Sequence, residues 1–327
     1  MFFSLIVPLY NRSDEIRELL ESLTEQTFKD FEVIVVEDGS KIPAEEIVMG
    51  FADRLDVKYY FKPNSGQGFA RNYGFERANG QYFVIFDSDI IVPPYYLEAV
   101  YRDVTTKQLD AFGGPDAAHS SFTDTQKAIS YAMTSYFTTG GIRGKKKNLG
   151  PYHPRSFNMG LSRKVYETVG GFIIPYMGED IEFSIRIIRA GFKTALIPDA
   201  YVFHKRRTDL KQFYKQLHFF GRARINIYTF FKDELKLVHF FPAAFTIYLI
   251  VLALSLLVAP LVFFVLYAFL LLFITLIFID ASWQYRSVKI GLLSVGASLV
   301  QLTAYGIGFM GEFYKRIILK RPNDGRK

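Results

Sequence analysis

The sequence predicts an α/β domain with a mostly parallel central sheet and helices on both faces, followed by C-terminal transmembrane helices. Three observations lead to this prediction. Short apolar strands alternate with amphipathic helices over the first hundred residues, which is typical of a covered parallel sheet. Polar residues follow several of these strands directly. Farther along the chain, the 43 residues from Leu237 to Ile279 contain no Asp, Glu, Lys or Arg.

The first part of the chain divides into regular elements. The first apolar run, Met1–Pro8, is expected to be a buried strand and not a signal peptide, because it has no basic leader. Apolar residues recur at helical spacing after it, with Ser13 as the expected N-cap. The expected strands are Phe2–Val7, Phe31–Val36, Val57–Phe61 and Tyr82–Phe86. The expected helices are Ser13–Thr24, Pro43–Ala52, Gly66–Ala78 and Pro94–Val104.

The second part of the chain is expected to enter a membrane. One helical span needs ~20 apolar residues, so the 43-residue run fits two spans with a turn near Ala259–Pro260. A second uncharged run, Ile290–Gly311, is rich in small residues, as in helices that pack together in lipid. The expected organisation is therefore a domain at 1–204, amphipathic interfacial helices at 205–236, membrane helices at 237–311 (237–258, 261–279 and 290–311) and a basic tail at 312–327.

The distribution of charge supports a membrane partner. The net charge of +7 is compatible with nucleic acid or with a membrane surface. Residues 1–236 hold 31 basic and 29 acidic side chains, whereas residues 237–327 hold 8 and 3. The excess lies beside the most apolar stretch, which favours anionic lipid over nucleic acid. The absence of cysteine excludes a disulfide scaffold, a thiolate zinc site and a cysteine nucleophile.

The membrane topology has two possible solutions from the sequence. Three spans place the two ends of the membrane segment on opposite sides. The positive-inside rule, however, favours a cytoplasmic position for the basic tail as well as for the first domain. Either Ile290–Gly311 is re-entrant or interfacial, or the rule fails here. Residues 130–160 show little periodicity and are expected to form a loop, which either meets an acceptor or is simply solvated.

One short motif has the chemistry of a cation site. Asp87-Ser88-Asp89 follows a nearly apolar strand, and ligands of parallel sheets bind at the carboxyl ends of the strands. Two carboxylates at positions i and i+2 can reach one hard cation, for which oxygen ligands suit Mg²⁺ or Mn²⁺. A solvated turn is the alternative for this motif taken alone.

Four further segments give the motif a context. Three of them precede Asp87-Ser88-Asp89, namely Ser4–Asn11, Val35–Ser40 and Asn64–Gly74, and the fourth, Gly178–Arg186, follows it. Together they closely resemble the family 2 glycosyltransferases, which are inverting enzymes of GT-A fold. The resemblance covers about residues 1–230. The chain lacks the Gln-x-x-Arg-Trp motif of processive members, since its single tryptophan is Trp283.

The resemblance implies roles for the nucleotide-binding side of the site. Pro8, Tyr10 and Asn11 would line the nucleotide pocket, and Asp38 would accept hydrogen bonds from the base and ribose. Arg71 would approach the donor diphosphate. Apart from the resemblance, the basic and aromatic segment Phe220–Arg224 is expected to close over the diphosphate, with Arg222 as its contact.

The resemblance also implies metal and catalytic roles. Asp87 would face the ribose and the metal, Asp89 would bind the metal, and His204 would be a third ligand unless it is only a surface histidine. Glu179 and Asp180 are both expected to be catalytic, and Asp180, the second acid of the pair, matches the catalytic base. A base is needed to take the proton of the acceptor hydroxyl, and a helix start favours an ionised carboxylate. Simple capping of the helix is the alternative for this acid pair.

The function implied by the resemblance is transfer from a UDP- or GDP-sugar with Mg²⁺ or Mn²⁺. The apolar segments make a polyprenyl-linked glycan the expected acceptor, in cell-surface polysaccharide assembly at the inner (cytoplasmic) membrane, with the catalytic domain in the cytoplasm. Transfer to polyprenyl phosphate itself and a non-catalytic membrane scaffold are the alternatives. A nucleotidyltransferase is a weaker one, because its glycine-rich phosphate loop is absent near the N-terminus.

Overall fold

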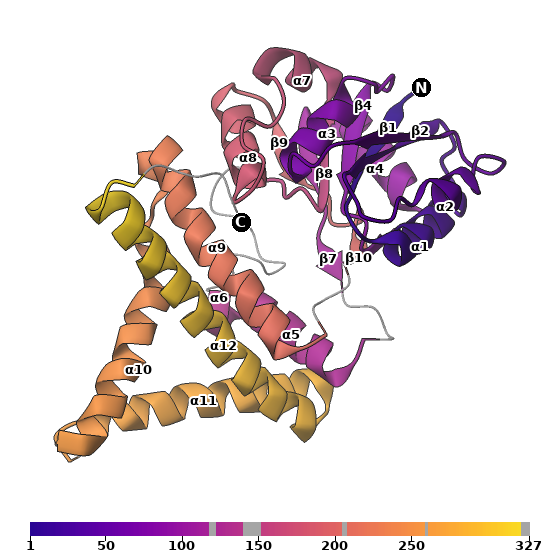
Figure 1. Ribbon diagram of the computed structural model, residues 1–327. Coiled ribbons are helices and arrows are strands. Elements are labelled where there is room, and N and C mark those ends of the chain that lie inside the picture. The colour runs from indigo at the N-terminus through magenta and orange to yellow at the C-terminus, as the bar shows by residue number, and fades with distance from the viewer. Residues whose placement is uncertain (118–121, 140–151, 205–207, 259–260, 322–327) are drawn as a thin grey trace. The chain divides into compact units, whose positions relative to one another are not determined.

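The computed structural model describes residues 1–117, 122–139, 152–204, 208–258 and 261–321, which form two compact units (Figure 1). The first unit contains residues 1–117 and 152–204 and is built around a sheet. The second contains residues 122–139, 208–258 and 261–321 and is helical. Each unit has hydrophobic clusters of its own.

The first unit confirms the predicted α/β fold. Its seven-stranded sheet has the order β3-β2-β1-β4-β8-β6-β9. Only β8 runs antiparallel to its neighbours β4 and β6. The strands are β1 (Phe3–Leu9), β2 (Phe31–Asp38), β3 (Val57–Lys62), β4 (Tyr82–Phe86), β6 (Ala111–Gly113), β8 (Asn158–Ser162) and β9 (Thr194–Leu196). A second, three-stranded sheet has the order β5 (Ile90–Ile91), β10 (Val202–His204) and β7 (Asp116–Ala117).

Helices cover both faces of the large sheet because its strands are apolar on both sides (Figure 1). Leu5 and Val7 of β1 pack with helices α1 (Ser13–Thr24), α2 (Glu45–Met49) and α4 (Tyr96–Lys107). Ile6, between them, packs on the opposite face with α3 (Gln67–Phe75), α7 (Arg163–Val169) and α8 (Glu179–Arg189). This alternation follows from the two-residue period of a strand.

Helix α1 has the predicted bounds but not the predicted cap. Its N-cap residue is Arg12, and no side chain caps the helix there. Ser13 is already the first helical residue, so the prediction of Ser13 as N-cap was wrong by one position. Arg12 instead turns its guanidinium toward Asp89.

The second unit consists of helices arranged around α12 (Val288–Phe313). Three helices of this unit are long and apolar enough to cross a membrane, at Leu237–Val258, Phe264–Tyr285 and Val288–Ile318. The other helices pack beside α12, and a π-helical turn, Tyr314–Ile318, follows it. These other helices are α5 (Asp124–Thr134), α6 (Tyr136–Thr139) and α9 (Leu210–Phe230). The first two candidate spans contain α10 (Phe241–Val258) and α11 (Phe264–Tyr285).

The expected loop at 130–160 was wrong where the structure describes it. Residues 124–134 form α5, which begins with a capping box between Thr123 and Gln126. Ala128, Ile129 and Ala132 of this helix are buried with residues of α9 and α12. The basic stretch at 140–151 lies outside the described residues.

Candidate active site

The candidate site lies in the first unit, where adjacent parallel strands end. Strands β2, β1 and β4 are neighbours in the sheet, so their carboxyl ends share one edge. Asp38 is the last residue of β2, Tyr10 follows β1, and Asp87 follows β4. The sheet therefore brings together residues that are almost eighty positions apart in the sequence.

Arg71 of α3 connects two predicted parts of the site. One guanidinium nitrogen donates to Asp87 Oδ1 at 2.9 Å, and another donates to Glu179 Oε1 at 3.0 Å. The guanidinium also lies over the ring of Phe172, at 5.4 Å from its centre. Arg71 is only 1% exposed. This buried cation thus links the acid after β4 to the acid at the start of α8.

The two acids of the Glu179-Asp180 pair have different environments. Glu179 is buried and accepts hydrogen bonds from Arg71 and Gln67. Burial, followed by the negative charge of Asp180, raises the pKa of Glu179, and Arg71 acts in the opposite direction. The side chain of Asp180 is 20% exposed, and Arg155 lies 3.6 Å from its Oδ2. Asp180 is therefore the acid of the pair that solvent or a substrate can reach.

Glycine and acidic residues position this pair at the helix start. Gly178 precedes α8 with φ of +93°, a left-handed conformation that glycine adopts without strain. Glu179, Asp180 and Glu182 occupy the first turn, where the helix dipole favours negative charge. Arg186, one to two turns farther along α8, donates to Glu182 and to the carbonyls of Val169 and Gly171.

Asp89 has a basic partner that the sequence analysis did not identify. Arg12 donates to Asp89 Oδ2 and is part-buried beside it. Burial lowers the pKa of Arg12, but Asp89, with smaller effects of Glu15 and Asp87, outweighs burial and raises it. Arg12 follows the opening segment Ser4–Asn11 directly, but nothing in the sequence links it to a residue 77 positions away.

Asp38 and its hydrogen-bond partners form the part of the site at the end of β2. Asp38 Oδ1 accepts from Lys62 at 2.7 Å and from the Ser65 N–H at 2.9 Å, and Oδ2 accepts from the Gly66 N–H at 2.8 Å. Tyr176 donates its hydroxyl to Asn64 Oδ1 at 3.1 Å, and Asn64 in turn donates to the Asp38 carbonyl at 2.7 Å. Burial, followed by the negative charge of Asp38, raises the pKa of Tyr176. Asp38 therefore fixes the turn between β3 and α3 close to Tyr176.

Asn11 joins the ends of two strands. Its N–H donates to Ser40 Oγ at 2.7 Å, and its Oδ1 accepts from the Lys41 N–H at 2.9 Å. Asn11 has φ of +52°, which asparagine tolerates better than most residues. The neighbouring Tyr10 is exposed, and Pro8 lies within β1.

The acids at this edge have the chemistry of a hard-cation site. Asp87 and Asp89 offer carboxylate oxygens, which suit Mg²⁺ or Mn²⁺. Residue His204 pairs with Ile90 across the antiparallel strands β10 and β5, so its backbone lies opposite the residue after Asp89. Within the described residues, no group of three or more His, Asp and Glu side chains is gathered for a metal. The donor types fit a divalent cation, and Arg12 and Arg71 now occupy the carboxylates.

Arg222 belongs to the other unit. Its Nε donates to Glu312 Oε2 of α12 at 3.0 Å. The predicted contact of Arg222 with a donor diphosphate stays a prediction.

Comparisons with known proteins agree on the class of protein. The fold resembles that of the mannosyltransferase PcManGT from Pyrobaculum calidifontis in complex with GDP-Man and Mn²⁺, with a TM-score of 0.64 and 18% identity over 91% of this chain and 86% of that one. It also resembles S. aureus TarS 1-349 in complex with UDP, with a TM-score of 0.50 and 22% identity over 69% and 66% of the two chains. These likenesses confirm a GT-A-like fold.

The sequence comparison identifies the family. The profile of glycosyl transferase family 2 matches residues 4–170, so this chain belongs to that family. An uncharacterized glycosyltransferase of Rickettsia typhi is 39% identical over 95 residues, which are 29% of this chain and 29% of that protein. The match thus spans less than a third of the length of this curated relative. The predicted resemblance to family 2 is confirmed.

Proposed function

We propose that the protein transfers a sugar from a nucleoside diphosphate to a hydroxyl group of a membrane-associated, polyprenyl-linked glycan, with inversion at the anomeric carbon. The observation that carries this proposal is the buried Arg71, which joins Asp87 at the end of β4 to Glu179 at the start of α8. Arg71 thereby connects Asp87, which is expected to face the donor, with the Glu179-Asp180 pair, which is expected to act on the acceptor. Family membership and the three apolar helices support it.

Asp180 is the proposed general base. In an inverting transfer, the acceptor oxygen bonds to the anomeric carbon while the bond from that carbon to the diphosphate oxygen breaks. The base takes the proton of the acceptor hydroxyl during this step. Asp180 is accessible, whereas Glu179 is buried and held by Arg71 and Gln67. Glu179 is therefore assigned to position Arg71 and the start of α8.

The donor is proposed to bind along the edge formed by β2, β1 and β4. Pro8, Tyr10, Asn11 and Asp38 would surround the nucleoside, and Arg71 would approach the diphosphate. A divalent cation held by Asp87, Asp89 and His204 would neutralise charge on the departing nucleoside diphosphate. UDP and GDP-Man with Mn²⁺ are bound by the structural neighbours and are the first nucleotides to consider.

A donor screen tests the binding half of the proposal. The full chain, purified in detergent, is heated with UDP- and GDP-sugars in the presence of Mn²⁺. One nucleotide sugar is expected to raise the unfolding temperature, because a ligand of the folded state stabilises it. If no nucleotide sugar binds or is hydrolysed, the non-catalytic scaffold becomes the better interpretation.

The variant Asp180→Asn separates the two enzymatic alternatives. With a hydroxyl acceptor, loss of the base is expected to lower kcat by about 10²–10⁴-fold. With polyprenyl phosphate as acceptor, the attacking oxygen is already anionic and needs no base. Near-full turnover of the variant with a lipid phosphate would favour that alternative and reject Asp180 as base.

A cytoplasmic position for the catalytic unit is part of the proposal, because nucleotide sugars are made there. The three candidate spans indicate membrane association. The proposed place of action is the cytoplasmic face of the cell membrane, in cell-surface polysaccharide assembly.

A further inference from the structure

The membrane unit contains a compact cluster of charged residues outside the candidate active site. Glu312 of α12 is only 2% exposed and accepts hydrogen bonds from two arginines. Arg222 of α9 donates to its Oε2 at 3.0 Å, and Arg316 of the following π-helical turn donates to its Oε1 at 2.7 Å. One negative charge therefore orients two guanidinium groups, which keeps a net positive charge in this triad.

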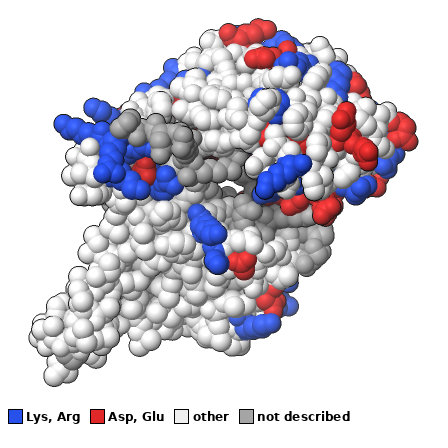
Figure 2. Space-filling view, in the orientation of Figure 1, with Lys and Arg blue, Asp and Glu red and all other residues white. Residues whose placement is uncertain are grey.

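Further basic residues lie near the triad of Glu312, Arg222 and Arg316. Burial lowers the pKa of His218, and the positive charges of Arg222 and Lys315 lower it further, while Glu312 opposes them. Figure 2 shows that Lys and Arg gather at the end of the unit where α9 and α12 end, whereas the surface over α10 and α11 is almost uncharged. The start of α10 also lies here, because Ala243 is buried together with Phe309 of α12, and lipid headgroups lie where a membrane span begins.

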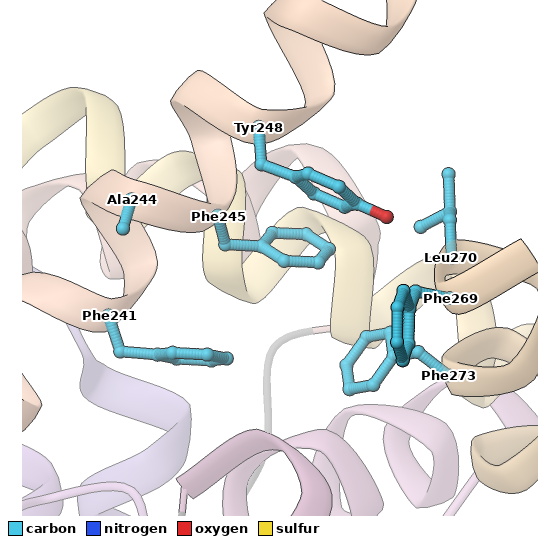
Figure 3. A pocket seen from close by; sticks show the side chains of 7 residues that line it. All are labelled: Phe241, Ala244, Phe245, Tyr248, Phe269, Leu270 and Phe273. Carbon is cyan, nitrogen blue, oxygen red and sulfur yellow. The ribbon is translucent and has the colours of Figure 1, made fainter. Parts of the chain in front are cut away.

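An apolar pocket lies between two of the membrane helices. It has a volume of about 340 Å³ and is lined by Phe241, Ala244, Phe245 and Tyr248 of α10 and by Phe269 and Phe273 of α11 (Figure 3). The rings of Phe245 and Phe273, with centres 5.5 Å apart, are in contact and form part of its wall. Tyr248 donates its hydroxyl to the Leu266 carbonyl, so the one polar group in this lining is satisfied within the protein.

Aromatic rings connect the pocket to the charged cluster. Phe241, in the pocket wall, follows Phe240, whose ring lies 5.1 Å from Phe309 of α12. Phe309 in turn lies 6.3 Å from Phe313, the neighbour of Glu312 in the chain. From Phe241 to Tyr248 the pocket wall extends about 10 Å along α10, at 1.5 Å per helical residue. The exposed rings of Phe240 and Phe241 and the buried ring of Phe309 thus link the pocket to the chain neighbour of Glu312. The charged cluster, the two exposed rings and the pocket are called the amphiphilic surface below.

We propose that this surface binds an anionic phospholipid, with its phosphate on Arg222 and Arg316 and one acyl chain in the pocket between α10 and α11. Glu312 is the positioning residue that orients both guanidinium groups. The Arg222 side chain is 22% exposed, and Arg316, which is 7% exposed, would exchange its 3.3 Å hydrogen bond to the Arg321 carbonyl for the phosphate. Guanidinium groups suit phosphate because their planar donors match its oxygens. A free phosphate ion would leave the apolar pocket empty, so the expected ligand carries an acyl chain as well as a phosphate. Arg222 is also predicted to contact the donor diphosphate, so the test below changes Arg316 and the pocket, to which the proposed transfer assigns no role.

Lipid binding to the full chain in detergent tests the site. The probes are dioleoyl phosphatidylglycerol, dioleoyl phosphatidylcholine and glycerol 3-phosphate, measured by native mass spectrometry and by the shift of the unfolding temperature. Phosphatidylglycerol is expected to bind and to stabilise the protein, and the other two to do so far less. Binding should also raise the pKa of His218 in an NMR titration, because the phosphate offsets the nearby positive charge.

Variants locate the binding. Arg316→Gln is expected to weaken phosphatidylglycerol binding by about tenfold or more, as loss of a charged hydrogen-bonding partner implies. Arg316→Lys should restore part of it, and Ala244→Trp should weaken it by filling the pocket while leaving the triad intact. Lys289→Gln, the same charge change at the other end of α12, is the matched control and should bind as the unaltered chain does.

Three results would overturn the proposal. The first is unchanged phosphatidylglycerol binding in both Arg316→Gln and Ala244→Trp. The second is equal binding of phosphatidylcholine. The third is displacement of phosphatidylglycerol by far lower concentrations of undecaprenyl phosphate, which would assign the surface to an isoprenoid phosphate instead.

Discussion

At the scale of single residues, Arg71 carries the most information about the candidate site. It is buried, it bonds to acids from two different elements, and it lies over an aromatic ring. A buried charge of this kind is costly unless all its partners are in place. Its position is therefore coupled to the positions of Asp87 and Glu179.

Replacing Arg71 should affect both stability and turnover. Arg71→Gln leaves Glu179 buried without its cation and is expected to cost about 3–5 kcal/mol of unfolding free energy. Arg71→Lys keeps the charge but loses the forked geometry, so an intermediate loss is expected. Thermal unfolding and kcat/KM measure the two effects. Arg54→Gln, which breaks an exposed pair with Glu21, is the control; an equal loss in both variants would contradict this account of Arg71.

Glu32 is expected to stabilise the folded chain at neutral pH and to lose this effect in acid. Burial raises its pKa, but hydrogen bonds from Lys58, Ser4 and the Asn79 N–H outweigh burial, so the folded-state pKa lies below its ordinary value of 4.5. The unfolded chain therefore binds a proton more readily. The stabilisation by Glu32 is complete above about pH 4.5 and is lost as the pH falls through the lower, folded-state pKa.

The variant Glu32→Gln tests this contribution. At pH 7 it should lower the unfolding free energy by about 2 kcal/mol, as expected for hydrogen bonds to a charged group. The difference from the unaltered chain should shrink in acid, measured by unfolding temperature between pH 7 and pH 3. Glu21→Gln, at an exposed pair, should change little at any pH. A difference for Glu32→Gln that grows in acid would reverse the predicted sign.

Sequence reasoning found the acids of the site better than their partners. Asp38, Asp87 and Asp89 follow apolar strands, and strand order alone brings such ends together. Arg12 and Arg155 were missed as partners of Asp89 and Asp180, because each pairing depends on the fold and no local pattern marks it. The assigned roles of these residues stay predictions.

At the scale of elements, local pattern predicted helices with one clear apolar face. Helix α1 has the expected bounds because Ile16, Leu19, Leu20 and Leu23 repeat at helical spacing. Helix α5 was missed because residues around its whole circumference, including Ser130 and Tyr131, are buried by other helices. A helix enclosed by its neighbours shows no period, so its sequence resembles an irregular segment.

Glycines determine how closely α9 and α12 approach. A Cβ on Gly308 would lie 2.1 Å from the His218 carbonyl oxygen, and a Cβ on Gly221 would lie 2.1 Å from that of Tyr305. Backbone atoms cannot move aside as a flexible side chain can. Two glycines on facing helices therefore permit a close backbone contact.

Gly308→Ala is expected to separate these helices and destabilise the membrane unit. Overpacking of this kind costs about 1–3 kcal/mol. Gly311→Ala, one turn farther along α12, meets nothing within 4 Å and should be neutral or slightly stabilising. Unfolding temperatures in one detergent compare the two variants. Equal temperatures would show that the close contact contributes nothing to stability.

At the scale of the whole molecule, α12 differs from the other two candidate spans. Half of its apolar window is buried by protein, compared with 28% for α10 and 11% for α11. Helices α5 and α9 cover it, with Phe213 and Leu217 of α9 packed beside Ala297 and Ala304. Helix α9 also carries Lys211, Lys215, Arg222 and Arg224.

The charges on α9 restrict where α12 can lie. A lysine or arginine at the centre of a bilayer costs about 2.5–3.5 kcal/mol, so α9 is not expected to cross the hydrocarbon beside α12. Amphipathic helices rich in basic and aromatic residues lie instead in the headgroup region. We therefore expect α10 and α11 to cross as a hairpin and α12 to lie in the interface with α9. This arrangement satisfies the positive-inside rule for Lys315 and the basic residues after it.

Labelling of single cysteines can test this topology directly, because the chain contains no cysteine of its own. The variants Lys236→Cys, Leu261→Cys and Lys320→Cys place a thiol before α10, in the turn between α10 and α11, and after α12. Sealed vesicles of known orientation are treated with a membrane-impermeant maleimide. Positions 236 and 320 are expected to react from the same side and position 261 from the opposite side, since two crossings separate α10's start from α11's end. Reaction of position 320 together with position 261 would mean that α12 crosses the membrane, and the charged helix α9 would then need a water-filled or protein-lined path beside it.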